Sequence, residues 1–343
     1  MEYIRLGSSG LIVSRMAFGA MTFSSGNRDL PSVYKVESTV ADRLVGQALD
    51  AGINFFDTAD VYARGQSEEI LGKALGAKRE QVVIATKVGG RFSSDLLDAG
   101  LSRRHIMRSV DASLSRLGTD WIDVYIVHRD CPYTPLEEVI QALDDVVRAG
   151  KVRYLGFSNW PAWRVAKAME MMRANGLAPF THGQMFYSLA ARDVENEFMP
   201  MLQQYGLGLT VWSPLAGGFL TGKYPRNGQS AEGTRHAGFD MMPIDLDRGY
   251  RVLDVLQTIA AAHNASPAQI ALAWLLAKRQ VSSILLGASK AEQLADTLKA
   301  SQIKLSDEQM TQLEAASAPP ALYPAWFIER FADRRTEKSL AVK

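Results

Sequence analysis

Short apolar runs alternate along this chain with longer segments in which apolar residues recur every three or four positions. The apolar runs contain few polar residues at alternate positions, which is typical of strands buried on both faces of a parallel sheet. The longer segments have the spacing of amphipathic helices. From residue 16 onward, eight such runs are each followed by a helical segment, so the pattern predicts an alternating α/β fold.

The predicted elements begin with a small hairpin whose strands are 3–6 and 11–13, ahead of the main fold. The eight main strands are predicted at 16–19, 53–57, 82–87, 121–127, 152–157, 182–185, 207–211 and 282–286. The helices that follow them are predicted at 39–51, 67–75, 102–117, 135–149, 163–175, 197–205, 266–278 and 291–299.

Eight strand-and-helix units favour a closed (β/α)8 TIM barrel over an open doubly wound sheet, and no Gly-x-Gly-x-x-Gly turn follows the first strand. No change in composition marks a second domain. We therefore expect one domain over residues 1–343, with the barrel at about 15–300 and a C-terminal helix and substrate-loop tail at about 305–343.

Capping signals and loop lengths add detail to this outline. Ser67 is predicted to cap the second helix, and Ser266 and Ser306 each begin a capping box with a glutamine three residues later. The stretch 217–247 is too long for a plain connection and is predicted to be a functional flap.

The charge balance limits the range of partners. The 343 residues include 38 basic and 37 acidic side chains, a formal net charge of +1, which argues against binding to nucleic acid or to an anionic membrane. Cys131 is the only cysteine, so an internal disulfide is impossible. The amino terminus lacks the layout of a signal peptide, and we expect a soluble cytoplasmic protein.

Four chemically active side chains lie at or just after predicted strand ends: Asp57, Tyr62, Lys87 and His128. Each alone has an ordinary structural explanation, such as a loop cap or a solvated side chain. In a barrel, however, the carboxyl ends of the strands converge on one face. The shared position favours a common site.

One chemistry suits this set. A phenol has an ordinary pKa of about 10, and an adjacent ammonium stabilises its anion. Lys87 is suited to stabilise that anion, and Asp57 is suited to hold Lys87 as its ion pair. His128 is expected to orient a carbonyl oxygen or to assist the proton transfer. Tyr62 is then a proton donor aimed at a carbonyl, which is useful only if a hydride reaches the carbonyl carbon.

With these residues and their order, the chain resembles the aldo-keto reductases from about residue 7 to residue 305. The run from Phe56 to Tyr62, together with Lys87 and His128, is similar to that family's Asp, Tyr, Lys and His tetrad. The resemblance implies that Tyr62 is the general acid and that NADPH supplies the hydride.

The resemblance also implies a set of cofactor contacts along the strand ends. Ser158, Asn159 and Gln184 are similar to residues that hold the nicotinamide carboxamide, and Trp212 to the aromatic that stacks on its ring. The remaining implied contacts are Gly19, Met21, Asp57, Ser213, Pro214, Leu215, Gly217, Thr221, Lys223, Arg235, Gly287, Ser289, Lys290 and Gln293.

Three cations near the implied adenosine end favour NADP over NAD, because NAD lacks the 2′-phosphate that they would offset. They are Lys223, Arg235 and Lys290. No metal site is expected.

Within the family, the chain is most similar to the branch that contains the potassium-channel β subunits. His128 stands where those subunits carry an amide, which favours turnover, and Asp296-Thr297 replaces a usual acidic-Asn pair. This resemblance motivates a second hypothesis beside a carbonyl reductase, a cofactor-sensing regulatory subunit with slow turnover. A metal-dependent barrel hydrolase is a third hypothesis.

Aromatic residues in the loops suggest a xenobiotic, aryl or ring-shaped ketone as the small-molecule substrate; the alternative is that each of them packs its loop over the barrel rim. The loops concerned are 21–34, 89–98, 129–134 and 160–163, together with Tyr323, Trp326 and Phe327 in the tail. The sequence leaves the oligomeric state open.

Overall fold

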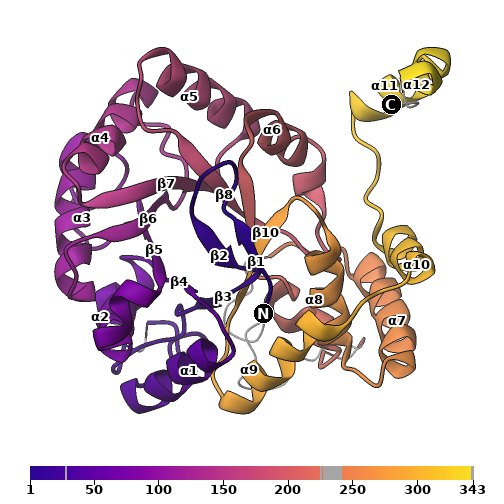
Figure 1. Ribbon diagram of the computed structural model, residues 1–343, viewed down its shortest axis with the longest axis horizontal. Helices are drawn as coiled ribbons and strands as arrows, with labels where there is room; N and C mark the ends of the chain where they lie inside the picture. Colours follow the sequence, from indigo (N-terminus) through magenta and orange to yellow (C-terminus); the bar gives the residue numbers. More distant parts are fainter. Residues whose placement is uncertain (28, 225, 227–241, 341–343) are drawn as a thin grey trace.

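Eight parallel strands close into a barrel in the computed structural model, which describes residues 1–27, 29–224, 226 and 242–340. Around the barrel the order is β10-β3-β4-β5-β6-β7-β8-β9, and helices surround it (Figure 1). The (β/α)8 barrel predicted from the sequence is confirmed. The strands are β3 Met16–Gly19, β4 Phe55–Asp57, β5 Val83–Val88, β6 Ile122–Val127, β7 Val152–Ser158, β8 Phe180–Phe186, β9 Gly208–Trp212 and β10 Val281–Leu286.

The α-helices and short 3-10 helices follow the strands in turn. The α-helices are α1 Ser38–Asp50, α2 Gln66–Leu75, α3 Arg103–Leu117, α4 Leu136–Arg148, α5 Ala162–Ala174, α6 Phe198–Tyr205, α7 Leu246–Ala262, α8 Pro267–Ala277, α9 Ala291–Leu298, α10 Asp307–Ser317, α11 Ala325–Arg330 and α12 Arg334–Leu340. The 3-10 helices are η1 Tyr62–Gly65, η2 Gly76–Gln81, η3 Asp193–Glu195, η4 Ala216–Thr221 and η6 Lys299–Gln302.

On β3, β4, β5, β6 and β10, neighbouring apolar side chains enter two separate clusters. On β6, Val124 and Ile126 belong to the cluster inside the barrel, whereas Tyr125 and Val127 pack among the surrounding helices. Both faces of the strand are therefore buried, which explains why these runs lack alternation in the sequence.

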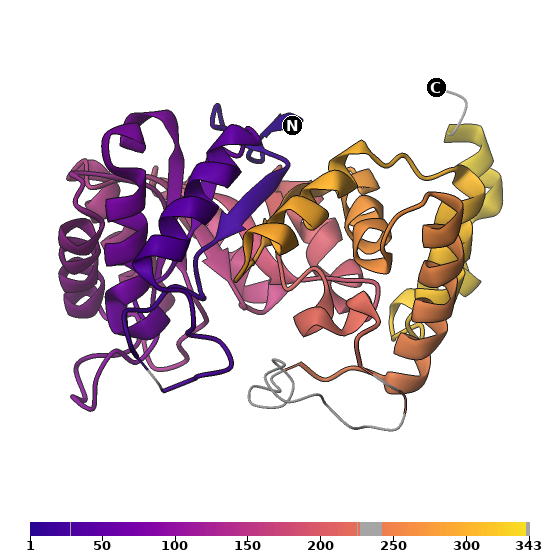
Figure 2. The same ribbon diagram turned by 90° about the horizontal axis from the view of Figure 1, so that it is seen from below.

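The predicted hairpin covers one end of the barrel. Its strands are β1 Tyr3–Arg5 and β2 Ile12–Ser14, which pair antiparallel. Leu6 and Val13 are fully buried in the inner cluster. Figure 2 shows the hairpin at the upper end of the molecule and the loop between β3 and α1 at the lower end, so the lower end remains for a site.

Two of the three predicted helix caps are present. Ser266 and Ser306 form capping boxes with Gln269 and Gln309. The prediction for Ser67 is wrong, because this residue lies inside α2, whose N-cap is Gly65. Its buried hydroxyl instead donates to the carbonyl oxygen of Ala20 at 2.7 Å.

Two further regions differ from the predicted elements. Helix α7 was not predicted; its residues Val252, Leu256 and Ile259 are buried. The predicted flap at 217–247 begins with η4, and most of it lies outside the described residues. Helices α11 and α12, also not predicted, lie apart from the barrel in Figure 1, and all their residues are exposed or nearly so.

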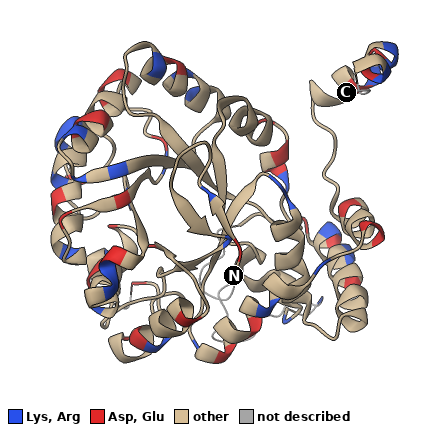
Figure 3. Cartoon of the chain, viewed as in Figure 1, with Lys and Arg blue, Asp and Glu red and all other residues tan. Residues whose placement is uncertain are grey.

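Charged side chains of both signs are interspersed over the outer helices (Figure 3), in agreement with the near-zero net charge. Within the described residues, no helix combines the length and the apolar composition needed to cross a membrane.

Candidate active site

The predicted tetrad comes from neighbouring strands at one end of the barrel. Asp57 is the last residue of β4, Lys87 is near the end of β5, and His128 follows β6. Tyr62 begins η1, directly after β4. Because the strands are parallel and in register, the structure brings these four residues together.

Lys87 is a buried cation with fixed partners. Its Nζ donates to Asp57 Oδ1 at 2.6 Å and to the carbonyl oxygen of Thr58 at 2.7 Å. Gln184 Nε2 donates to the other carboxylate oxygen of Asp57 at 2.7 Å. Burial lowers the pKa of Lys87, but Asp57 and Tyr62 outweigh burial and raise this pKa overall. The ammonium therefore stays charged at neutral pH.

Tyr62 lies between this cation and His128. Nζ of Lys87 is 5.1 Å from the centroid of the Tyr62 ring, and the His128 ring meets that ring edge-on at 5.6 Å. Lys87 lowers the pKa of Tyr62 in the expected direction, but burial is the larger effect and the pKa is raised overall. Tyr62 therefore carries its proton at neutral pH, as a proton donor must.

His128 is a neutral imidazole. Burial, followed by the charges of Lys87 and Arg129, lowers its pKa to about 3. Its backbone is fixed, because its N–H donates to the carbonyl oxygen of Val88 at 2.8 Å and its own carbonyl accepts from Asn159 Nδ2 at 2.9 Å. The ring can donate or accept one hydrogen bond without adding charge.

Unusual backbone conformations gather around the site. Five non-glycine residues at the strand ends have positive φ angles near 50°, a conformation that L-residues rarely adopt. They are Ala63, Arg64, Asn159, Ser213 and Ala216. Such strain persists only where the surrounding structure enforces it, and it is concentrated at functional sites.

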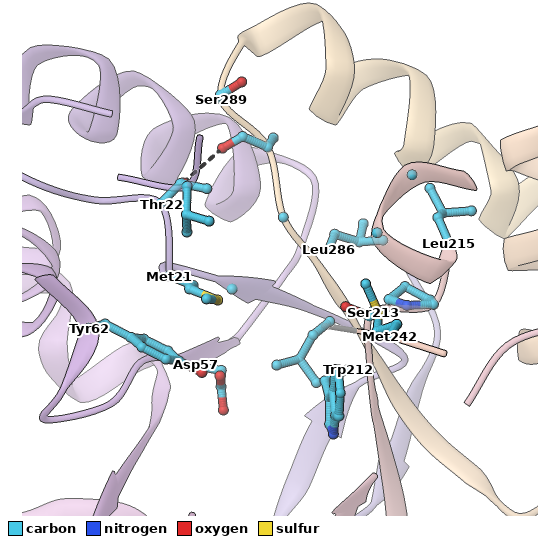
Figure 4. A pocket seen from close by; sticks show the side chains of 18 of the residues that line it. Met21, Thr22, Asp57, Tyr62, Trp212, Ser213, Leu215, Met242, Leu286 and Ser289 are labelled. Carbon is cyan, nitrogen blue, oxygen red and sulfur yellow. Dashed lines mark hydrogen bonds between the residues drawn. The ribbon is translucent and has the colours of Figure 1, made fainter. Parts of the chain in front are cut away.

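The tetrad lies at one side of a cavity of about 1300 Å³. Figure 4 shows Tyr62 and Asp57 on one side, Trp212 and Ser213 on the other, and Thr22 near Ser289 at the far end. A hydrogen bond from Thr22 Oγ1 to the carbonyl oxygen of Ala288, at 3.3 Å, links the loop after β3 to the loop after β10.

Nearly all of the residues predicted from the sequence line this cavity. They are Gly19, Met21, Asp57, Tyr62, His128, Ser158, Asn159, Gln184, Trp212, Ser213, Pro214, Leu215, Gly217, Thr221, Lys223, Gly287, Ser289, Lys290 and Gln293. Lys87 lies beneath the surface, fully buried. Arg235 lies outside the described residues.

Further lining residues come from three of the loops predicted to select the substrate. The sequence did not single them out within these loops, because a loop has no periodicity that reveals the direction of a side chain. Leu30, Val33 and Tyr34 come from the loop after β3, and Arg91 and Arg129 from the loops after β5 and β6. The sequence analysis assigned Gln184 to the cofactor and did not predict its hydrogen bond with Asp57. The position of Gln184 near the end of a predicted strand could have indicated this contact.

Part of the predicted substrate surface is elsewhere. In the described structure, Tyr323, Trp326 and Phe327 of the tail do not line the cavity and are exposed. Trp160 is buried, where its ring packs against Phe180 at 5.8 Å. These four aromatic residues are therefore not part of the described cavity lining.

The cavity lining fits a nicotinamide dinucleotide. The half-exposed Trp212 ring stacks on Phe186 with centroids 4.9 Å apart, and its Nε1 has no hydrogen-bond partner in the described part of the chain. Gly217 and Gly218 have positive φ angles and present backbone without side chains, as close approach of a phosphate requires. At Gly287, which also lines the cavity, a Cβ would meet nothing within 4 Å, so the space beside its backbone is open.

A metal-dependent site has less support. Among the residues that the structure describes, no three His, Cys, Asp or Glu side chains are grouped in a way that could hold a metal ion.

Comparisons with known proteins agree with this geometry. The model of the aldo/keto reductase family matches residues 15–318. A probable voltage-gated potassium channel subunit beta of Oryza sativa subsp. japonica is 38% identical over 327 residues, covering 92% of this chain and 96% of the relative.

Two further relatives are named as enzymes. Versiconal hemiacetal acetate reductase of Aspergillus parasiticus is 36% identical over 346 residues, covering 94% of this chain and 99% of the relative. A putative aryl-alcohol dehydrogenase of Schizosaccharomyces pombe is 35% identical over 341 residues, covering 92% and 95%. Because the family model covers the whole barrel and these relatives are similar over nearly their full length, the chain belongs to the aldo/keto reductase family and is an oxidoreductase.

Proposed function

We propose that this protein reduces an aldehyde or ketone to the alcohol with NADPH, reversibly, and that Tyr62 supplies the proton. The observation that carries this proposal is the protonated Tyr62 phenol beside the buried Lys87–Asp57 pair at one side of a large cavity. The family match and the relatives named as reductase and dehydrogenase support the reaction class.

The reaction consumes one hydride and one proton. When bound, NADPH supplies the hydride for the carbonyl carbon and becomes NADP⁺. The Tyr62 hydroxyl gives its proton to the carbonyl oxygen, so the C=O bond becomes CH–OH. Lys87 then stabilises the resulting phenolate, and a proton from solvent restores Tyr62.

The other two members of the tetrad prepare this step. Asp57 holds Lys87 in place and keeps its ammonium charged in a buried site. His128 is neutral, so its ring can direct a hydrogen bond at the carbonyl oxygen without placing a second cation beside Lys87.

We assign the cofactor to the end of the cavity formed by β9, β10 and the loops after them. Trp212 would stack on the nicotinamide ring, and Ser158, Asn159 and Gln184, which line the same cavity, would bind the carboxamide. Lys223 and Lys290 line the cavity, and their charges support a preference for NADPH over NADH.

The remaining end of the cavity, near Tyr62, supports an aryl or ring-shaped carbonyl substrate. Leu30, Val33 and Tyr34 provide apolar surface there. The name of the relative in Schizosaccharomyces pombe, a putative aryl-alcohol dehydrogenase, agrees with this class.

A spectrophotometric screen tests the proposal. NADPH and NADH oxidation would be measured with a panel of aryl, alicyclic and short aliphatic aldehydes and ketones, and the products identified. We expect aryl or cyclic carbonyls to be reduced to alcohols, faster with NADPH. Absence of cofactor oxidation with every carbonyl would contradict the proposal.

A second candidate function is a cofactor-binding regulatory subunit with slow turnover. It is motivated by the relatives named as channel β subunits. This function predicts tight NADPH binding, negligible reduction of all carbonyls and a stable complex with a partner protein. The same screen, with a measurement of NADPH affinity, distinguishes the two.

A further inference from the structure

The turn that presents Tyr62 to the cavity is strained. Three consecutive residues after the tyrosine, Ala63, Arg64 and Gly65, have φ angles of 49°, 54° and 88°. Two of them are not glycine, and an L-residue adopts this conformation only at a cost in free energy. Interactions beneath the turn must therefore hold it.

Arg116 of α3 lies directly under this turn. A Cβ at Gly65 would come within 2.6 Å of Arg116 Cδ, so the backbone rests on that side chain. Arg116 Nε donates to Glu68 Oε2 at 2.6 Å, and Thr86 Oγ1 donates to the other oxygen, Oε1, at 2.5 Å. Glu68 is fully buried, and both its oxygens have partners.

A second carboxyl group, that of Asp60, is buried beside this pair. Asp60 is 2% exposed, and its backbone N–H donates to the carbonyl oxygen of Lys87 at 3.3 Å. Its Oδ1 has no hydrogen-bond partner among the described residues, and neither has the hydroxyl of Tyr125. An ionised carboxylate is costly to bury with an oxygen left without a donor, whereas a neutral carboxylic acid costs much less.

We propose that Asp60 is a positioning residue that works as a neutral carboxylic acid. When Asp60 is protonated, the turn after Tyr62 packs on Arg116, which Glu68 holds in place. This packing keeps Tyr62 beside Lys87. Loss of the proton places two negative charges against one guanidinium in a buried site, and the turn loosens. The effect on catalysis rests on the proposed function; the protonation of Asp60 does not.

The charged groups around Asp60 come from four elements. Glu68 faces it from α2, Arg116 from α3, Lys87 from β5 and the Tyr125 phenol from β6. Burial, followed by repulsion from Glu68, raises the pKa of Asp60 to about 8, against the opposing effects of the Val61 backbone, Arg116 and Lys87. Since the pKa of Tyr62 is raised from 10, the two titrations are well separated.

Infrared difference spectroscopy of the full chain tests the protonation directly. Between about pH 6 and about pH 10, the wild type should lose the C=O band of a protonated carboxylic acid. The band should be missing in Asp60→Asn and unchanged in Asp42→Asn, a control at an exposed aspartate of α1. A band that persists in Asp60→Asn would overturn the proposal, whether or not the protein reduces carbonyls.

The pH profile of kcat tests the positioning role. Asn resembles a neutral Asp, so Asp60→Asn should match the wild type within about threefold near pH 6.5, and exceed it about tenfold near pH 9. An unchanged alkaline limb in Asp60→Asn would contradict the proposal, as would a large loss at pH 6.5 in a variant with normal thermal stability.

A second variant covers the case in which Asp60→Asn does not fold. Glu68→Gln removes the carboxylate that raises the pKa of Asp60 and frees Arg116 for it. Both effects favour ionised Asp60, so the alkaline limb and the loss of the infrared band should move to lower pH. Movement to higher pH, or none, would overturn the proposal.

Discussion

At the scale of single residues, burial and the charges of neighbouring groups together determine the charge of Lys87 and of His128. His128 and Lys87 share the same end of the barrel, yet one is neutral and the other charged. The difference lies in the neighbouring charges, because Lys87 is paired with the Asp57 carboxylate, whereas His128 is affected by the positive charges of Lys87 and Arg129. At neutral pH the site therefore holds a protonated Tyr62, a charged Lys87 and a neutral His128.

The neutral state of His128 makes stability depend on pH. Its pKa is about 3 in the folded protein and about 6.5 in an unfolded chain, so between these values only the unfolded chain binds the proton. Stability therefore falls as the pH falls through this window. From pH 7 to pH 5 the loss is at most about 2 kcal/mol, and less because the ring is partly exposed.

Urea unfolding of the wild type and of His128→Asn at these two pH values measures this contribution. The variant cannot titrate at this position and should lose less stability on acidification. An equal loss in both proteins would contradict the assignment. His182, which is fully buried with a pKa of about 3, contributes equally to both and leaves the comparison valid.

The Lys87–Asp57 pair predicts a large effect on stability. Asp57→Asn leaves a buried ammonium without its counter-charge, which costs about 3–5 kcal/mol. The control is Glu2→Gln, which breaks an exposed pair with Lys304 and should cost less than about 1 kcal/mol. Chemical denaturation of the two variants would show this difference, and equal costs would contradict the account.

At the scale of elements, the contact between α2 and α3 depends on a glycine. A Cβ at Gly72 would lie 2.3 Å from the carbonyl oxygen of Leu117, a backbone atom that cannot easily move. This close approach brings α3, with Arg116, near the turn that carries Tyr62. The turn that carries Tyr62 and the packing of α2 on α3 are therefore connected.

Two glycine substitutions test this packing. Gly72→Ala should destabilise the protein by more than about 2 kcal/mol, because α2 and α3 must separate. Gly46→Ala in α1 is a matched control, since nothing lies within 4 Å of its Cβ position. It should stabilise the protein by about 0.5–1 kcal/mol through helix propensity. Thermal unfolding would show the opposite signs, and shifts of the same sign would contradict the prediction.

Some sequence patterns were sufficient to predict the helices and strands, and others were not. Apolar runs without alternation predicted all eight barrel strands, since burial on both faces leaves little room for polar residues. Ser67 was misread because its hydroxyl serves a tertiary contact with Ala20, which local sequence does not reveal. Helix α7 was missed although Asp245 caps it, because the long preceding loop obscured its start.

At the scale of the whole molecule, the barrel explains why a site can be predicted from strand ends. Asp57, Lys87 and His128 are far apart in sequence, and parallel strand order brings them together. The sequence could not give the balance that sets the pKa of Tyr62, because burial depends on loops from several strands. It also could not give the direction of the tail.

The exposed tail predicts that its removal has little effect on activity. A chain ending at residue 318 would lose α11 and α12, none of whose residues is buried. Turnover of the preferred carbonyl should remain within about twofold and the melting temperature within about 3 °C of the full chain. A large rise in KM would show instead that Tyr323, Trp326 or Phe327 reaches the substrate.

The comparison of Tyr62→Phe with the wild type tests the central claim most directly. The variant keeps the ring but lacks the proton, so kcat for the preferred carbonyl should fall about 100- to 10,000-fold. NADPH affinity, measured by fluorescence titration, should stay within about threefold, which would show an intact cavity. Turnover equal to that of the wild type would contradict the role of Tyr62 as the proton donor.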